Sequence, residues 1–278
     1  MRLADEKLLL SPSDLSNHLV CAHLTTLNLA VARGEMQAPK TDDHFVEVLR
    51  ARGDEHEKAY VASLLERGLN VTDLSGHKFS DDAFEATRSA IGSGAPVIVQ
   101  AALAGEGWAG YADILIRVAT SSALGDWSYE VVDTKLAQET RGGTILQLCA
   151  YSEMVGEIQG RTPERFHVVT PGDPFVEQTY RFDEYAAYYR FVRARLEAAV
   201  GAVEADQTYP EPVEHCDICR WQRVCSKRLR ADDHLSLVAG IRRSQRDELT
   251  RHAVRTLAAR RNYRCPSPSS RSAARARQ

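Results

Sequence analysis

The sequence lacks the long apolar segments that membrane proteins carry. A helix needs about 20 consecutive apolar residues to cross a bilayer, and every apolar run in this sequence is much shorter. The first 14 residues have acidic side chains beside a short apolar patch and no small-residue cleavage site, so we expect no signal peptide. We also find no internal repeat. These absences favour a cytoplasmic protein without a membrane partner.

Cysteine is scarce, with six in 278 residues, and this argues against a disulfide scaffold. In a reducing compartment such cysteines are more often metal ligands or buried thiols. The rest of the composition is ordinary, because 44% hydrophobic and 26% charged residues suffice for a globular protein with a sizeable core.

The formal net charge of −3 conceals an asymmetry along the chain. Residues 220–278 have a balance of +12, whereas residues 1–219 have a balance of −15. A basic end of this kind suits a surface that grips phosphates. A solvated basic tail is the alternative interpretation.

Apolar periodicity and turn residues predict a mixed α/β layout. A first helix should begin at Pro12 after the N-cap Ser11, with apolar positions that recur as far as Leu29. Gly53 indicates a local break or a close contact within a second helix. Further helices are predicted over 41–67, 81–91, 144–158 and 183–205, and strands over 69–74, 97–103, 108–118, 128–136 and 166–170. The three middle strands should form an antiparallel meander.

The character of the sequence changes after residue 209. Pro210 and Pro212 mark a linker into a Cys-rich segment at 216–225, and 235–258 is predicted to be helical, with a tight turn at Gly240. We therefore expect one domain over residues 1–230, a small helical segment over 231–262 that faintly resembles a helix-hairpin-helix unit, and a disordered basic tail over 263–278.

A carboxylate and a lysine share one side of a predicted strand. Asp133 and Lys135 are two residues apart, so they point to the same face, about 7 Å from each other. Asp113 lies on the preceding strand, which can bring it beside Asp133. Two such carboxylates are costly unless a cation lies between them. The pattern is typical of phosphodiester hydrolysis with Mg²⁺ or Mn²⁺ held by the acids, although an Asp-x-Lys on a solvated strand is common.

Two further candidates lie on predicted helices. Gln147 and Tyr151 are four residues apart and share a helical face that can bind a phosphate or a base edge. His56 could add an imidazole to a metal site. Each also has an ordinary interpretation as a surface or half-buried side chain.

Taken in order, these residues resemble the motifs of the RecB-like nucleases of the PD-(D/E)xK superfamily. The set comprises His56, Asp113, Asp133-x-Lys135 and Gln147-x₃-Tyr151. It is similar to the motif set of the AddAB B subunit and of the CRISPR-associated RecB-family exonucleases. The resemblance implies a restriction-endonuclease-like core, in which the histidine and both acids bind the metal. It also implies that the lysine is catalytic and that the Gln/Tyr helix contacts DNA. The second acid is Asp where many relatives have Glu. Longer relatives continue into a helicase, so a helicase is an expected partner, and this chain could be a shortened form of such a protein.

The cysteines give a second line of evidence. The spacing Cys216-x₂-Cys219-x₅-Cys225 allows three thiolates to converge, and a fourth from a distant helix would complete a Cys₄ site. Together with Cys21 the pattern resembles that of iron–sulfur nucleases, in which a [4Fe–4S] cluster joins the two ends of the domain. Zn²⁺ is the alternative.

Three functions therefore remain open from the sequence. The first is a metal-dependent DNA nuclease that acts on single strands or ends. The second is a non-catalytic iron–sulfur module that binds DNA for a helicase. The third is a zinc-stabilised or thiol-redox protein.

Overall fold

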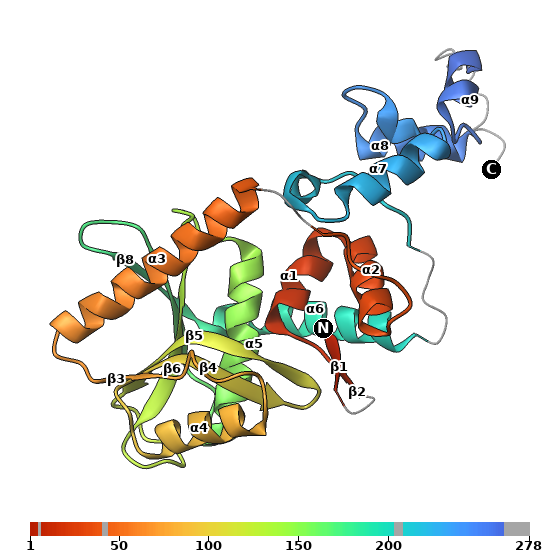
Figure 1. The fold of residues 1–278 in the computed structure, drawn as a ribbon. Coiled ribbons are helices and arrows are strands. Elements are labelled where there is room, and N and C mark those ends of the chain that lie inside the picture. Colours follow the sequence, from red (N-terminus) through yellow and green to blue (C-terminus); the bar gives the residue numbers. More distant parts are fainter. Residues whose placement is uncertain (5–6, 41–43, 203–207, 264–278) are drawn as a thin grey trace, which may run out of the picture. The chain divides into compact units, whose positions relative to one another are not determined.

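The computed structural model describes residues 1–4, 7–40, 44–202 and 208–263. The chain forms two compact units, residues 1–208 and 209–278 (Figure 1). Three predicted features lie outside the described residues: the helix start at 41–43, the end of the helix predicted to reach residue 205, and the basic tail from residue 264. In the part of the chain that the structure describes, no helix has the length and apolarity needed to cross a membrane.

The first unit combines six helices with eight strands among its described residues. The helices are α1 Pro12–Val20, α2 Ala22–Ala32, α3 His44–Glu66, α4 Asp81–Gly92, α5 Gly142–Gln159 and α6 Phe182–Gly201. The strands are β1 Arg2–Ala4, β2 Lys7–Leu9, β3 Val71–Asp73, β4 Val97–Gly105, β5 Trp108–Val118, β6 Ser128–Thr134, β7 Arg165–Thr170 and β8 Val176–Arg181.

Strands β3 to β8 form one mixed sheet in sequence order. The central β4–β5–β6 meander is antiparallel, as predicted, while β3 pairs with β4 and β6 pairs with β7 in parallel. Each parallel pair needs a crossover, which α4 and α5 supply. The predicted α/β class with a helix-flanked mixed sheet is therefore confirmed.

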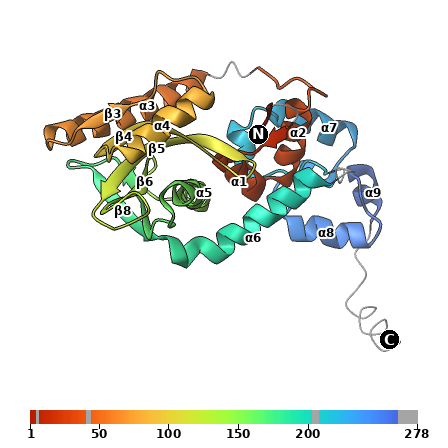
Figure 2. The same cartoon turned by 90° about the horizontal axis from the view of Figure 1, so that it is seen from below.

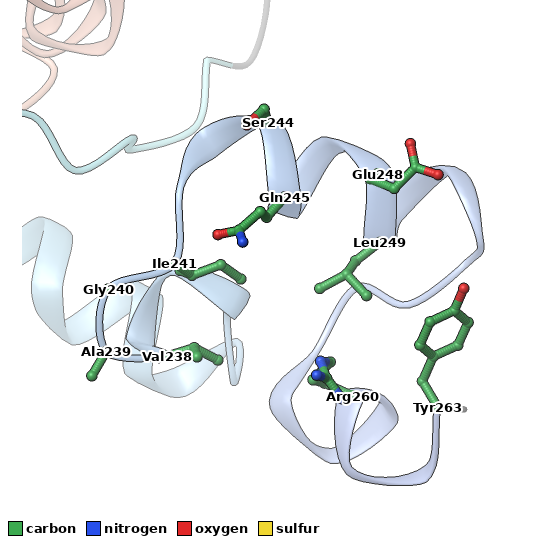
Figure 3. Close-up of a pocket in the computed structure, with 10 residues that line it drawn as sticks. All are labelled: Val238, Ala239, Gly240, Ile241, Ser244, Gln245, Glu248, Leu249, Arg260 and Tyr263. Atoms are coloured by element: carbon green, nitrogen blue, oxygen red, sulfur yellow. The ribbon is translucent and has the colours of Figure 1, made fainter. Parts of the chain in front are cut away.

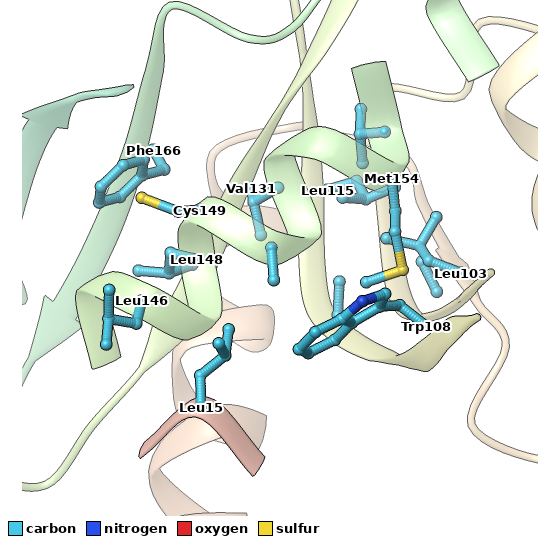
Figure 4. Close-up of a cluster of buried hydrophobic side chains, with 14 of the residues drawn as sticks. Leu15, Leu103, Trp108, Leu115, Val131, Leu146, Leu148, Cys149, Met154 and Phe166 are labelled. Atoms are coloured by element: carbon cyan, nitrogen blue, oxygen red, sulfur yellow. The ribbon is translucent and has the colours of Figure 1, made fainter. Parts of the chain in front are cut away.

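Two apolar cores lie on the two sides of this sheet. The smaller contains Tyr60 and Leu64 of α3 with strand residues such as Ile114. In the larger, α5 packs against the opposite strand face together with Leu15 of α1, as Figure 4 shows. Figure 2 accordingly shows α3 on one side of the strands, and α5 and α6 on the other. The central strands therefore lie between α3 and α5.

The first helix begins as predicted. Its N-cap is Ser11, Pro12 occupies the first turn, and the Ser11 amide donates to Asp14 Oδ2 at 2.9 Å, which closes a capping box. The prediction of apolar continuity as far as Leu29 misses a break. Cys21 has an extended backbone (φ −158°, ψ 105°) and is both the C-cap of α1 and the N-cap of α2. Cys21 therefore lies at a corner between two helices.

Two other predictions need correction, and an edge strand of the main sheet was not predicted. The break or close contact expected at Gly53 is wrong, because α3 is continuous there and a Cβ at this position would meet nothing within 4 Å. Strand β8 was not predicted, because it is a largely exposed edge strand with few apolar residues. The helix predicted over 235–258 consists of separate pieces, which belong to the second unit.

The second unit consists of short helices. They are η1 Glu214–Ile218, α7 Gln222–Ala231, η2 Leu235–Leu237, α8 Arg243–Arg251 and α9 Leu257–Asn262. The predicted tight turn at Gly240 is confirmed, with φ +71° just before α8. A similar turn at Ala253, with φ +61°, lies between α8 and α9.

Candidate active site

The β4–β5 hairpin carries an irregularity at its centre. Val99 pairs with Ile114 and Ala101 pairs with Ala112, so Gln100 and Asp113 lie opposite each other between these pairs. Val99 and Ile114 belong to the core cluster on the α3 side, whereas Ala101 and Ala112 belong to the one on the α5 side. Residues two apart in a regular strand share a face, so both strands change face at this point. Gln100 and Asp113 therefore behave as one extra residue in each strand.

Gln100 makes this change of face possible with an unusual backbone. Its φ is +55°, which is left-handed and uncommon for a residue with a side chain. Such conformations cost free energy and often lie at functional sites. Its side chain has a defined partner, since Nε2 donates to Glu57 Oε1 at 2.7 Å. The irregularity thus fixes one acid of α3 beside the strand that carries Asp113.

Strand pairing brings the predicted acids and lysine together. Ile114 pairs with Val132, which sets Asp113 beside the end of β6. Lys135 Nζ lies 2.6 Å from both side-chain oxygens of Asp133 and 4.0 Å from Asp113 Oδ2. The convergence of Asp113, Asp133 and Lys135 that the strand pattern predicts is present in the structure.

Burial and neighbouring charges shift the pKa values of Asp133 and Lys135 in this cluster. Asp133 is only 7% exposed. Its burial and the nearby charge of Asp113 raise the pKa of Asp133 well above the ordinary range of a carboxyl, although Lys135 opposes this. Burial alone would lower the pKa of Lys135. The negative charges of Asp133 and Asp113 outweigh the effect of burial, so the pKa of Lys135 is raised. Lys135 is therefore an ammonium at neutral pH, suited to stabilising charge.

Glu57 is a site residue that the sequence analysis missed. Burial and then the charge of Asp113 raise the pKa of Glu57, while the hydrogen bond from Gln100 and the charge of Lys135 lower it. Glu57 is thus within electrostatic range of the cluster. A signal was available, because Glu57 lies three and seven residues before the buried Tyr60 and Leu64 of α3. A carboxylate on a core-facing helical stripe is expensive unless a cation is nearby.

His56 lies near the same strand ends but makes a different contact. Its Nε2 is 3.3 Å from the carbonyl oxygen of Val169, which also accepts the Lys135 backbone amide at 2.9 Å. Its ring packs against Phe175, with centroids 5.5 Å apart. The role of His56 as a metal ligand stays a prediction, and ligation through Nε2 would require this contact to break.

The Gln147/Tyr151 pair lies on the side of α5 that faces α1. Gln147 Nε2 donates to Ser16 Oγ at 2.7 Å, and Ser16 Oγ donates to the Gly143 carbonyl oxygen at 2.8 Å. Burial and then the charges of Asp113 and Asp133 raise the pKa of Tyr151. Tyr151 therefore borders the carboxylates, whereas the Gln147 amide is held by α1.

The chemistry of this cluster fits a hard divalent cation. Glu57, Asp113 and Asp133 supply three carboxylates against the single ammonium of Lys135. Carboxylate oxygens are the ligands that Mg²⁺ and Mn²⁺ prefer. However, in the described part of the chain no three His, Cys, Asp or Glu side chains are already grouped to hold a metal ion. Lys135 Nζ lies against the carboxylates, so a bound cation would require it to move.

The predicted cysteine ligands are divided between the two units. Cys21 belongs to the first, while Cys216, Cys219 and Cys225 belong to η1, its C-cap and α7 in the second. The amide of Val213 donates to Cys216 Sγ at 3.4 Å, the type of bond that supports a sulfur ligand. A four-cysteine cluster that closes the first domain stays a prediction.

The second unit holds a cavity of about 650 Å³ between its short helices, shown in Figure 3. Its lining combines apolar side chains, among them Ile241 and Leu249, with Arg260 and Tyr263. The faint resemblance to a helix-hairpin-helix unit is consistent with the turns at Gly240 and Ala253, and phosphate binding there stays a prediction.

Comparison with models of known protein families gave no match, and a search of curated proteins found no significant relative.

Proposed function

We propose that the chain is a metal-dependent DNA nuclease that hydrolyses phosphodiester bonds, acting as an exonuclease on single strands or ends. The observation that carries the proposal is the convergence of Asp113, from the middle of β5, with Asp133 and Lys135 at the end of β6, and with Glu57 beside them. Three acids around one lysine, partly buried, have a clear chemical use if a divalent cation and a phosphate join them. The resemblance to the RecB-like PD-(D/E)xK nucleases supports the same conclusion.

Each residue then has a distinct role. Asp113 and Asp133 would hold Mg²⁺ or Mn²⁺, with Glu57 and His56 as further candidate ligands. The cation, when bound, supplies Lewis-acid stabilisation and a nucleophile at neutral pH. Lys135 stabilises the charge that develops on the phosphate, because its raised pKa keeps it protonated. Tyr151 borders the carboxylates and contacts the DNA.

Cleavage of labelled DNA by the purified chain tests the proposal. With Mn²⁺ the unaltered chain should degrade a labelled single strand, and Lys135→Ala should lower the rate by about 100- to 1,000-fold. Lys58→Ala is a matched control, because Lys58 is exposed on α3. Full activity in Lys135→Ala, or no activity in the unaltered chain, would refute the assignment.

We also propose that Cys21, Cys216, Cys219 and Cys225 hold a structural [4Fe–4S] cluster. The spacing of the cysteines and the hydrogen bond to Cys216 Sγ support it. Protein purified without oxygen should be brown and absorb at about 400 nm. A colourless protein with stoichiometric Zn²⁺ would instead establish the zinc alternative.

A non-catalytic DNA-binding module for a helicase is the second candidate. Two observations favour it: Lys135 Nζ already neutralises Asp133, and the described residues contain no ready metal-holding group. This function predicts salt-sensitive DNA binding without cleavage in Mn²⁺.

A further inference from the structure

A cavity beside the carboxylates has the chemistry of a nucleobase pocket. It measures about 320 Å³ and lies between the N-terminal segment, β5 and α5. Its lining includes Arg2, Ser11, Ser13, Phe79, Tyr111 and Tyr151. This volume lies near the lower end of the range of about 300–1,000 Å³ that small-molecule sites occupy. The cavity can therefore hold a ligand of nucleobase size.

The walls of the cavity are aromatic and cationic. The Phe79 and Tyr111 rings meet edge to face with centroids 5.6 Å apart, and the Arg2 guanidinium carbon lies 3.1 Å above the Phe79 centroid. Phe84 supports Phe79 from outside the lining, at 4.8 Å. Nucleobases stack on aromatic rings and on arginine planes. The described lining contains no acidic side chain, so an electron-rich base meets no repulsion there.

The cavity shares a wall with the proposed active site. Tyr111 lies two residues before Asp113 on β5, about 7 Å along the strand. Tyr151 lines the cavity and is close enough to Asp113 and Asp133 to feel both charges. A Cβ at Gly110 would lie 2.9 Å from the Tyr151 hydroxyl, so the tyrosine is packed closely against β5. A nucleotide whose phosphate lies at the carboxylates can thus direct a base into the cavity.

We propose that this cavity binds one unpaired nucleobase of the DNA strand that is cleaved; the inference rests on the proposed nuclease function. A base within a duplex is stacked on both faces and cannot enter. The Ser11 hydroxyl donates to Asp14 Oδ2 at 2.7 Å and lies 2.9 Å from the Ser13 hydroxyl, whose oxygen can accept a hydrogen bond from a base edge. The cavity therefore selects single strands and frayed ends, and it does so through stacking, which tolerates any base sequence.

Binding measured without a divalent cation tests the pocket separately from cleavage. The probe is a fluorescent single-stranded oligonucleotide in EDTA, compared by anisotropy with an abasic oligomer of equal length and with a duplex. We expect the full chain to bind the base-containing strand about tenfold more tightly than the abasic one. Phe79→Leu and Arg2→Ala should each remove most of that preference, whereas Phe191→Leu, which alters an exposed phenylalanine of α6 outside the lining, should keep it.

The outcomes separate the two proposals. Equal affinity of the unaltered chain for base-containing and abasic strands would overturn the pocket, even if the chain cleaves DNA with Mn²⁺. A base preference that survives both variants would also overturn the pocket. If Phe79→Leu fails to fold, Arg2→Ala still tests the pocket, because Arg2 is exposed and its replacement should not disturb folding. Displacement by a deoxynucleoside monophosphate without any strand preference would assign the cavity to free nucleotides instead. A base preference without cleavage would refute only the nuclease.

Discussion

The left-handed backbone of Gln100 permits a prediction in which stability and metal affinity change separately. Gln100→Gly and Gln100→Ala both remove the amide that holds Glu57, a hydrogen bond worth about 0.5–1.5 kcal/mol. Only glycine relieves the backbone at φ +55°, where other residues cost about 1–2 kcal/mol. Glycine also makes the unfolded chain more flexible, which costs about 0.4–1 kcal/mol.

The glycine variant should therefore be more stable than the alanine variant by about 1 kcal/mol. For a unit of this size that corresponds to a melting temperature about 2–4 °C higher. Both variants should bind Mn²⁺ more weakly, because Glu57 loses its orientation beside Asp113. Thermal unfolding without metal measures the first effect, and calorimetric titration with Mn²⁺ measures the second.

Glu106→Gly is the matched control, because Glu106 also has a positive φ, +25°, but lies in the exposed turn between β4 and β5. It should leave Mn²⁺ affinity unchanged. If the glycine variant at position 100 were no more stable than the alanine variant, the reasoning on backbone strain would be wrong. If both bound Mn²⁺ normally, Glu57 would have no part in the cation site.

Two further changes test the electrostatics and the packing. Asp133→Asn should raise the melting temperature of the metal-free chain near pH 7, because burial and Asp113 disfavour the charged carboxylate. A carboxyl whose pKa is higher in the folded than in the unfolded chain stabilises the fold below its unfolded pKa of about 3.9, and this contribution is lost as pH rises through the folded pKa. The gain in melting temperature from Asp133→Asn should therefore shrink on acidification, and a gain that grew would contradict the assignment. Gly110→Ala should destabilise the fold by about 1–3 kcal/mol in denaturant unfolding, since its Cβ would crowd Tyr151 and Pro12. Gly76→Ala, where a Cβ meets nothing within 4 Å, should be near neutral.

Much of the fold could be predicted because several of its strands and helix starts are determined by residues close together in the sequence. The long apolar runs of β4, β5 and β6 and the Ser11-Pro12 helix start depend on nearby residues alone. The edge strand β8 could not be found in this way, since its residues are mostly exposed and polar. The break at Cys21 was also missed, because apolar positions continue across it.

The site was predictable where strand alternation determines geometry. Asp133 and Lys135 share a face whatever surrounds them, and a neighbouring strand supplies Asp113. Glu57 was missed because its importance depends on the register between α3 and the sheet, which follows from tertiary packing. Gln100 has no marker in the sequence, since nothing local requires its positive φ.

The face change at Gln100 and Asp113 relates the present hairpin to a regular β-hairpin that lacks these two residues. Removing both residues would place Val99 beside Ala101 and Ala112 beside Ile114 in uninterrupted alternation, with every neighbouring side chain kept in its present core. Deleting only one of them would shift the register and turn one strand's core residues outward. The double deletion should therefore fold while either single deletion fails, as if the acidic residue had entered the sheet through a paired insertion.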